Sequence, residues 1–117
     1  MDLRELVRAL LSYDALTARQ WVADSVRQGV SWSSVPRPSD LTPLELQVAA
    51  GVVELLASRA GQPPPSWVSG IEGTATQVWL VKAAKTMPRL RRLCEEEGPE
   101  PLRRRGIFAP PEFLTVA

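Results

Sequence analysis

The chain has 117 residues, 44% of them hydrophobic, and a formal net charge of only +1 at pH 7. A chain of this length fits one domain and buries roughly two-thirds of its unfolded surface, so its core needs no metal or disulfide. The single cysteine, Cys94, excludes an intrachain disulfide and suits a reducing compartment. The first residues do not resemble a signal peptide, and no stretch approaches the roughly 18–20 apolar residues of a membrane span, so we expect a cytoplasmic protein.

Catalytic chemistry has few candidate residues in this sequence. Histidine is absent, which removes the commonest general base and the commonest metal ligand, and one cysteine cannot supply a zinc site. No glycine-rich phosphate-binding loop and no nucleophile elbow occurs. The acidic run Glu95–Glu97 is most simply the solvated end of a helix. We therefore expect no enzyme, no cofactor and no metal, with an enzyme that uses carboxylates alone as an alternative.

Two helices are predicted at the start of the chain. Apolar residues recur at helical spacing between Asp2 and Tyr13, which predicts an amphipathic helix; they are Leu3, Leu6, Val7, Leu10 and Leu11. Asp14 is a suitable N-cap for a second helix, ALTARQWVADSVRQ, and Gly29 stands just past its end. The following segment, rich in Ser and Pro, is a predicted loop that Trp32 and Val35 pin to the surface.

The clearest helix start is the sequence TPLE. Its capping box, Thr42–Glu45, encloses a proline at the first helical position. The helix stops at Gly61, after which three prolines forbid its continuation. Its polar residues lie along one narrow stripe, and a helix that is apolar nearly all round is typically buried. We therefore expect residues 42–60 to be the central helix of the domain, with Gly51 permitting a close helix crossing.

The second half of the chain holds shorter elements. One helical turn is predicted at Ser66–Gly70. Residues 78–85, VWLVKAAK, begin with β-prone side chains and end with helix formers, and we expect a helix because no partner strand is evident. A short helix follows in MPRLRRLCEEEG and one more turn in PEPLRRRG. The expected fold is all-α, a single compact domain of about five helices over residues 1–106, with an extended apolar tail over residues 107–117.

Positive charge is concentrated in residues 82–105. This segment holds eight of the 14 basic residues and four acids, which gives it a net charge of +4. Its arginines suit bidentate contacts to phosphate or carboxylate groups. The plainest interpretation is that they pair with the nearby glutamates, and the alternatives are a protein partner or nucleic acid. The overall charge of +1 argues against a dedicated nucleic-acid-binding protein.

The chain ends in PLRRRGIFAPPEFLTVA, where three arginines precede apolar residues that prolines keep out of a long helix. One interpretation is a strap that packs on the chain's own core. The other is a strip that docks on a partner protein, with the arginines steering and clamping acidic groups beside it. The candidate partner-binding residues are Arg103, Arg104, Arg105, Ile107, Phe108, Phe113 and Leu114.

Three pieces of the sequence carry a resemblance to a known family: residues Pro65 to Val68, Leu102 to Phe108, and Phe113 to Ala117. Together they resemble the C-terminal region of small bacterial antitoxin-like proteins paired with nucleotidyltransferase-type toxins, over roughly the last half of the chain. The resemblance implies stoichiometric inhibition, in which the antitoxin covers the active site of the toxin. The apolar pair Ile107 and Phe108 would fill a pocket, and the three arginines would face the carboxylates that such a toxin uses to hold Mg²⁺.

Two other functions stay open. The basic segment 82–105 also suits a nucleic-acid-associated regulatory protein, whose binding would fall steeply with salt. If the apolar tail packs on a second copy of the chain, the protein is a self-assembling helical module, which light scattering would detect.

Overall fold

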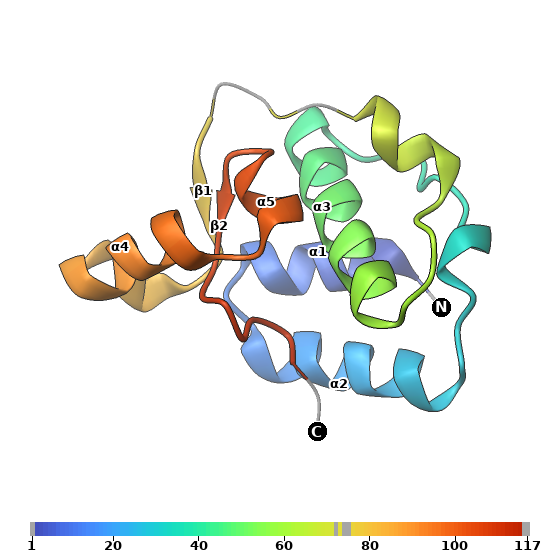
Figure 1. The fold of residues 1–117 in the computed structure, drawn as a ribbon, viewed down its shortest axis with the longest axis horizontal. Coiled ribbons are helices and arrows are strands. Elements are labelled where there is room, and N and C mark those ends of the chain that lie inside the picture. The colour runs from blue at the N-terminus through green and yellow to red at the C-terminus, as the bar shows by residue number, and fades with distance from the viewer. Residues whose placement is uncertain (1, 72, 74–75, 116–117) are drawn as a thin grey trace.

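The computed structural model describes residues 2–71, 73 and 76–115, and over these residues the chain is mostly helical (Figure 1). The all-α fold class is therefore confirmed. The α-helices are α1 (Leu3–Leu11), α2 (Ala15–Arg27), α3 (Pro43–Arg59), α4 (Pro88–Glu97) and α5 (Glu100–Arg103). The 3-10 helices are η1 (Trp32–Ser34), η2 (Ser66–Gly70) and η3 (Lys82–Lys85), and the strands are β1 (Val78–Trp79) and β2 (Ile107–Phe108). In this part of the chain, no helix is both long enough and apolar enough to cross a membrane.

The ends of the long helices follow the local signals in the sequence. Asp14 and Thr42 each accept a hydrogen bond from a backbone N–H in the first turn of α2 and α3, and Thr42 forms the expected capping box with Glu45. Helices α2 and α3 are followed by Gly29 and Gly61, which adopt φ angles of 63° and 67°. Glycine carries little penalty in this left-handed conformation, so both helices end where the sequence predicts.

Helix α3 is the centre of the core. Ten of its residues are buried, and α1, α5, η1 and η2 pack around it (Figure 1). At Gly51 a Cβ atom would lie 2.9 Å from Leu102 Cδ2 of α5 and 3.4 Å from Ile107 Cδ1 of β2. The absence of a side chain at Gly51 therefore lets α5 approach α3 closely, as the sequence predicts.

The loop before α3 is held against the core by tryptophans. Trp32 is buried, and its backbone N–H donates to Gln62 Oε1 over 2.7 Å. The indole N–H of Trp67 donates to the carbonyl oxygen of Val35 over 2.9 Å. Residues 30–35 are thus tied to the segment that follows α3, and the anchoring role predicted for this loop is confirmed.

The prediction of a helix over residues 78–85 is wrong for the first half of this segment. Residues 78–79 form strand β1, and only Lys82–Lys85 are helical, as η3. Strand β1 pairs in parallel with β2, in the register Val78 with Ile107 and Trp79 with Phe108. The prediction failed because the partner strand lies in the C-terminal segment, which prolines had marked only as extended.

The C-terminal segment packs on the chain's own core, so the strap interpretation holds within this chain. Ile107, Ala109 and Leu114 are buried in the same cluster as α3. The guanidinium of Arg59 at the end of α3 donates to two carbonyl oxygens of the segment, one of them that of Pro111 over 3.2 Å. The segment is extended only at β2 and then turns over residues 110–114, so it is not a freely extended tail.

Residues 82–97, which comprise η3 and α4, form an arm that projects from the rest of the molecule (Figure 1). The arm returns to the body at Gly98. A Cβ atom there would lie 2.5 Å from the carbonyl oxygen of Cys94 and closer still to that of Ala109, and both are backbone atoms that cannot rotate away. Glycine at this position therefore allows the base of the arm to pass under the C-terminal segment.

The replacement Gly98→Ala should destabilise the fold by about 1–3 kcal/mol, because overpacking against backbone atoms forces the chain to shift. The measurement is urea unfolding followed by circular dichroism. The matched control is Gly70→Ala, where a Cβ atom meets nothing within 4 Å; we expect a change within about 0.5 kcal/mol. Equal effects of the two variants would contradict the close approach at Gly98.

Candidate functional site

The arginine that the sequence placed nearest the apolar tail is buried. Arg105 is 4% exposed, and its guanidinium donates to the carbonyl oxygens of Pro101 (2.9 Å), Val68 (3.1 Å) and Ile71 (3.2 Å). Its Nη2 also lies 3.1 Å from Oε1 of Glu54, whose side chain is 18% exposed. A buried charge requires a counter-charge and hydrogen bonds to all sides, and these groups supply both.

The other two arginines of the run also contact the chain itself. Arg104 bridges Glu54 of α3 and Glu100 of α5, the latter over 3.3 Å. Arg103 Nη1 donates to the carbonyl oxygen of Glu96 over 2.9 Å, near the C-terminal end of α4, where backbone carbonyls lack helical partners. The backbone of Arg105 is held as well, because its carbonyl oxygen accepts from the side-chain amide of Gln47.

The structure therefore divides the seven candidate partner-binding residues. Arg105, Ile107 and Leu114 are buried, and Arg103, Phe108 and Phe113 are half-buried, which leaves Arg104 as the exposed member. Arg104 is itself engaged with two glutamates. The expected continuous strip of three arginines and an apolar tail is not presented to solvent. Arg104 and Arg105 pair with Glu54 of α3. The pairing with the glutamate run that the sequence suggests is found for the arginines of α4, because Arg91 lies 3.3 Å from Glu95 and Arg92 lies 4.0 Å from Glu96.

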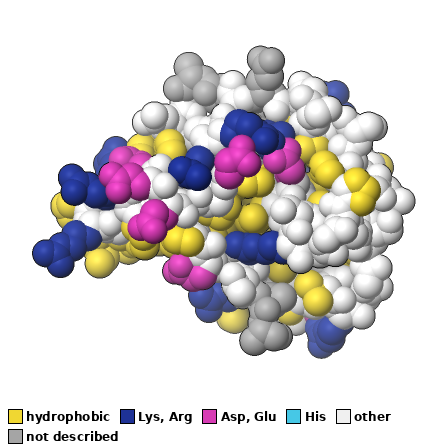
Figure 2. Space-filling model, in the orientation of Figure 1, with side chains coloured by type: hydrophobic (Ala, Val, Ile, Leu, Met, Phe, Trp, Pro, Cys, Tyr) yellow, Lys and Arg dark blue, Asp and Glu magenta, His cyan; other side chains and the backbone are white. Residues whose placement is uncertain are grey.

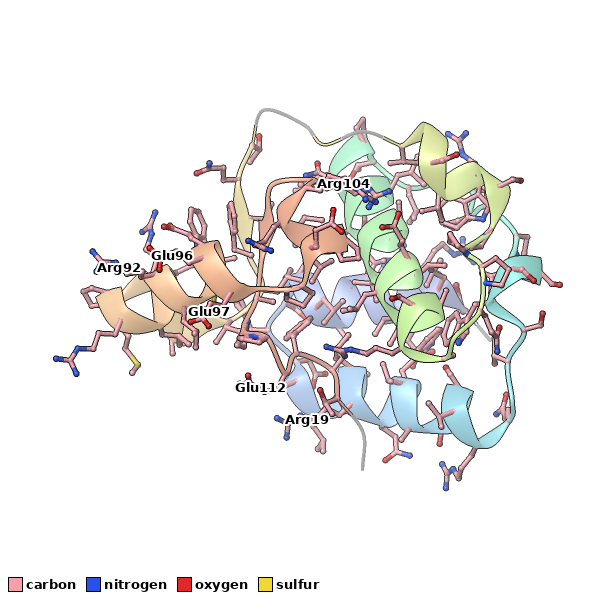
Figure 3. The ribbon with its side chains drawn as sticks, in the orientation of Figure 1. Arg19, Arg92, Glu96, Glu97, Arg104 and Glu112 are labelled. Carbon is pink, nitrogen blue, oxygen red and sulfur yellow. The ribbon has the colours of Figure 1, made fainter. Side chains whose placement is uncertain are left out.

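A groove of about 420 Å³ lies where the C-terminal segment meets the first two helices. One wall is the turn at residues 110–115, and the others come from the α1–α2 junction and from residues 80–83. Apolar groups line much of it, among them Leu10, Ala18, Leu80, Val81 and Phe113. Charged groups stand at its rim, and Figure 3 places two of them, Arg19 of α2 and Glu112 of the turn, beside each other. Sequence reasoning missed this groove because its walls come from three distant segments.

Two residues that line the groove hold an unusual backbone conformation. Tyr13 and Leu114 have φ angles of 61° and 58°, and among the described residues only one other non-glycine residue, Asp40, has a positive φ. For such a side chain the left-handed conformation costs about 1–2 kcal/mol relative to the right-handed one. Tyr13 follows α1 at the position where α2 and α3 are followed by glycine. The chain therefore keeps an aromatic and an aliphatic side chain at this groove against the local backbone preference.

The arm carries the exposed cations of the basic segment. We use the term arm cations for Lys82, Lys85, Arg89 and Arg92, all of which are exposed. Figure 2 shows basic side chains gathered at the far end of the arm, with acidic ones closer to the body. Arg91 is engaged differently, since it lies 3.3 Å from Glu95 and stacks over the ring of Trp79 at 4.2 Å.

Comparisons with known proteins leave the chain without an assigned family. No family model matches it, and neither a curated protein nor a solved structure is significantly similar to it. Within the described residues, no group of three or more Cys, Asp or Glu side chains is placed to hold a metal ion.

The internal role of Arg105 predicts unequal effects of two otherwise equivalent substitutions. Arg105→Met should destabilise the fold by about 3–5 kcal/mol, because it leaves Glu54 and three carbonyl groups with a lost partner in a buried site. Arg104→Met removes the two ion pairs of an arginine that is 47% exposed, so we expect a loss of about 0–1 kcal/mol. Urea unfolding of both variants measures the difference. If the two variants lost the same stability, the buried contacts of Arg105 would not be what stabilises the fold.

A second prediction concerns the base of the arm. Burial raises the pKa of the Cys94 thiol above its ordinary value, and the nearby carboxylate of Glu112 adds to the rise. Because the thiolate is the reactive form, Cys94 should react with a thiol-specific reagent much more slowly in the folded protein at pH 8 than in urea. Equal reaction rates in the two states would mean that Cys94, at the base of the arm, is accessible to solvent in the folded protein.

Proposed function

We propose that the chain is a non-catalytic binding protein that neutralises a partner enzyme by covering its active site. The groove walled by residues 110–115 carries this proposal, because it offers an apolar surface beside a core that is already complete. The resemblance to antitoxin-like proteins supports a nucleotidyltransferase-type toxin as the partner. The contact surface differs from the one the sequence suggested, since most of the tail is used inside the fold.

The occupant that best fits the groove is an apolar side chain from a partner protein, flanked by polar groups. The floor supplies aliphatic and aromatic contacts, and burial of apolar area is the main source of affinity in such a contact. The rim carries charges of both signs, including Arg19, Lys82 and Glu112, which would fix the orientation of the incoming segment and do not favour one sign of charge.

Internal pairing of the C-terminal arginines weakens the main alternative. Of the eight basic residues in the segment 82–105, the three C-terminal arginines contact the chain's own carboxylates and carbonyl groups, and Arg91 and Arg92 pair with nearby glutamates. Fewer cations are then free for phosphates, and a nucleic-acid-associated protein depends on such free cations. Self-assembly through the tail is likewise less favoured, because Ile107 and Leu114 are buried within one chain.

The test of this proposal must leave the C-terminal segment in place. A chain that ends at Gly106 would lose β2 and the buried Ile107, so failure to bind would only report unfolding. The groove can instead be filled by Ala83→Trp, because Ala83 is an exposed residue of its lining. The matched control is Ala60→Trp, which adds the same ring at an exposed position outside the groove lining.

The protein retained by the wild-type chain from the source cell is purified, and its nucleotide-transfer activity is measured with increasing amounts of each variant. We expect the wild type and Ala60→Trp to abolish the activity at one equivalent, and Ala83→Trp to need at least about tenfold more protein. Full activity of the retained enzyme in the presence of excess wild-type chain would refute neutralisation. Equal inhibition by all three proteins would refute the groove as the contact.

A further inference from the structure

The two arm cations on α4, Arg89 and Arg92, stand in an arrangement that the helix dipole does not explain. Helices α1, α3 and α5 each carry a glutamate in the first turn and an arginine in the last turn, which suits the helix dipole. Helix α4 has no acid in its first turn and no base in its last turn. Its order is the reverse, with Arg89, Arg91 and Arg92 near its start and Glu95–Glu97 at its end. This order of charges is unfavourable with the helix dipole.

The arm cations have few internal partners. Arg92 lies 4.0 Å from Glu96, and the two side chains are 79% and 66% exposed, so water screens most of their attraction (Figure 3). No carboxylate of the described residues lies within ion-pair distance of Lys82, Lys85 or Arg89. Lys85 stacks over the ring of Tyr13 at 4.9 Å, a contact that leaves its charge uncompensated.

The arm also lies next to the groove. Lys82 begins the arm and lines the groove, and Tyr13 lines the groove while it contacts Lys85. Near the start of α4, Met87 is 52% exposed, which adds an apolar group among the cations. Methionine and arginine are both enriched in protein–protein interfaces. The groove and the arm are therefore parts of one surface, with an apolar floor at one end and a basic projection at the other.

We infer that the arm docks on an acidic patch of a partner protein, with the arm cations facing carboxylates; this inference rests on the proposed function. Charge distribution favours a protein over nucleic acid. The phosphates of a nucleic acid form a continuous negative surface, which would repel Glu95, Glu96 and Glu97 wherever the length of α4 met it. A patch of carboxylates on a protein is local, so it attracts the basic end of the arm without meeting its acidic end.

The first experiment tests the arm without the natural partner. The probe is a fluorescent polyglutamate peptide, and binding is followed by anisotropy in about 20 mM NaCl, where screening is weak. The arm variant carries Lys85→Glu, Arg89→Glu and Arg92→Glu, and leaves the groove residue Lys82 unchanged. The matched control carries Arg8→Glu, Arg27→Glu and Arg37→Glu, three exposed positions outside the arm with the same change in net charge. Circular dichroism verifies that both variants fold.

We expect the arm variant to bind polyglutamate at least about tenfold more weakly than the wild type, and the control variant to stay within about twofold. Equal losses in the two variants would show a response to net charge alone and would overturn the inference. The same proteins are then tested with duplex DNA at about 150 mM NaCl. DNA binding that persists there and is lost only in the arm variant would identify the arm as a nucleic-acid contact, which also overturns the inference.

A second readout uses the purified partner enzyme. Because charge complementarity acts mainly on encounter, the arm variant should associate about tenfold more slowly and lose its salt dependence, while a groove variant should mainly dissociate faster. If the enzyme is neutralised and the arm variant associates normally, the arm inference fails and the proposed function stands. If no enzyme is neutralised but polyglutamate binding depends on the arm, the proposed function fails and the arm remains an acid-binding surface.

Discussion

The buried ion pair between Arg105 and Glu54 is the constraint on which the rest of the structure depends. Glu54 is a charged residue on a central helix that is otherwise largely buried, and Arg105 is its most buried partner. The same guanidinium fixes carbonyl groups of η2, of α5 and of the segment after η2. Removal of Glu54 would leave the buried charge of Arg105 without a carboxylate, and removal of Arg105 would leave three carbonyl groups without their donor, so these elements are held in one arrangement. Strand β2 begins two residues after Arg105, so these contacts also position β2 beside β1.

The parts of the fold that depend on neighbouring residues were predictable from the sequence. The capping box at Thr42, the glycine after α3 and the burial of α3 follow from short-range rules. The pairing of β1 with β2 was not predictable, because two-residue strands far apart in the sequence leave no periodic signal. The partner of Arg105 was also missed. An available signal was Glu54 itself, since an acid on a largely buried helix requires a counter-charge from elsewhere in the chain.

The two arginine clusters that look alike in the sequence have different roles in the structure. The C-terminal cluster, residues 103–105, joins α3, α4 and α5 to one another, so most of its charge is engaged inside the chain and is not available to a partner. The other cluster, Arg89, Arg91 and Arg92, lies near the start of α4 on the projecting arm, where positive charge opposes the helix dipole. Stability explains the first cluster and does not explain the second. The groove, which is lined by two residues in a disfavoured backbone conformation, lies next to the arm, so the two features share one surface.

Residue-resolved chemical modification of arginine by phenylglyoxal, read by mass spectrometry, tests this division most directly. Arg89 and Arg92 are exposed and should be modified rapidly in the folded protein, whereas Arg105 should react only as the protein unfolds in urea. That result would establish that Arg105 is buried within the fold and that the arm presents Arg89 and Arg92 to solvent. If Arg105 were modified in the folded protein as fast as Arg89, the burial of Arg105 beside Glu54 would be contradicted. Arg105 would then again be available to a partner.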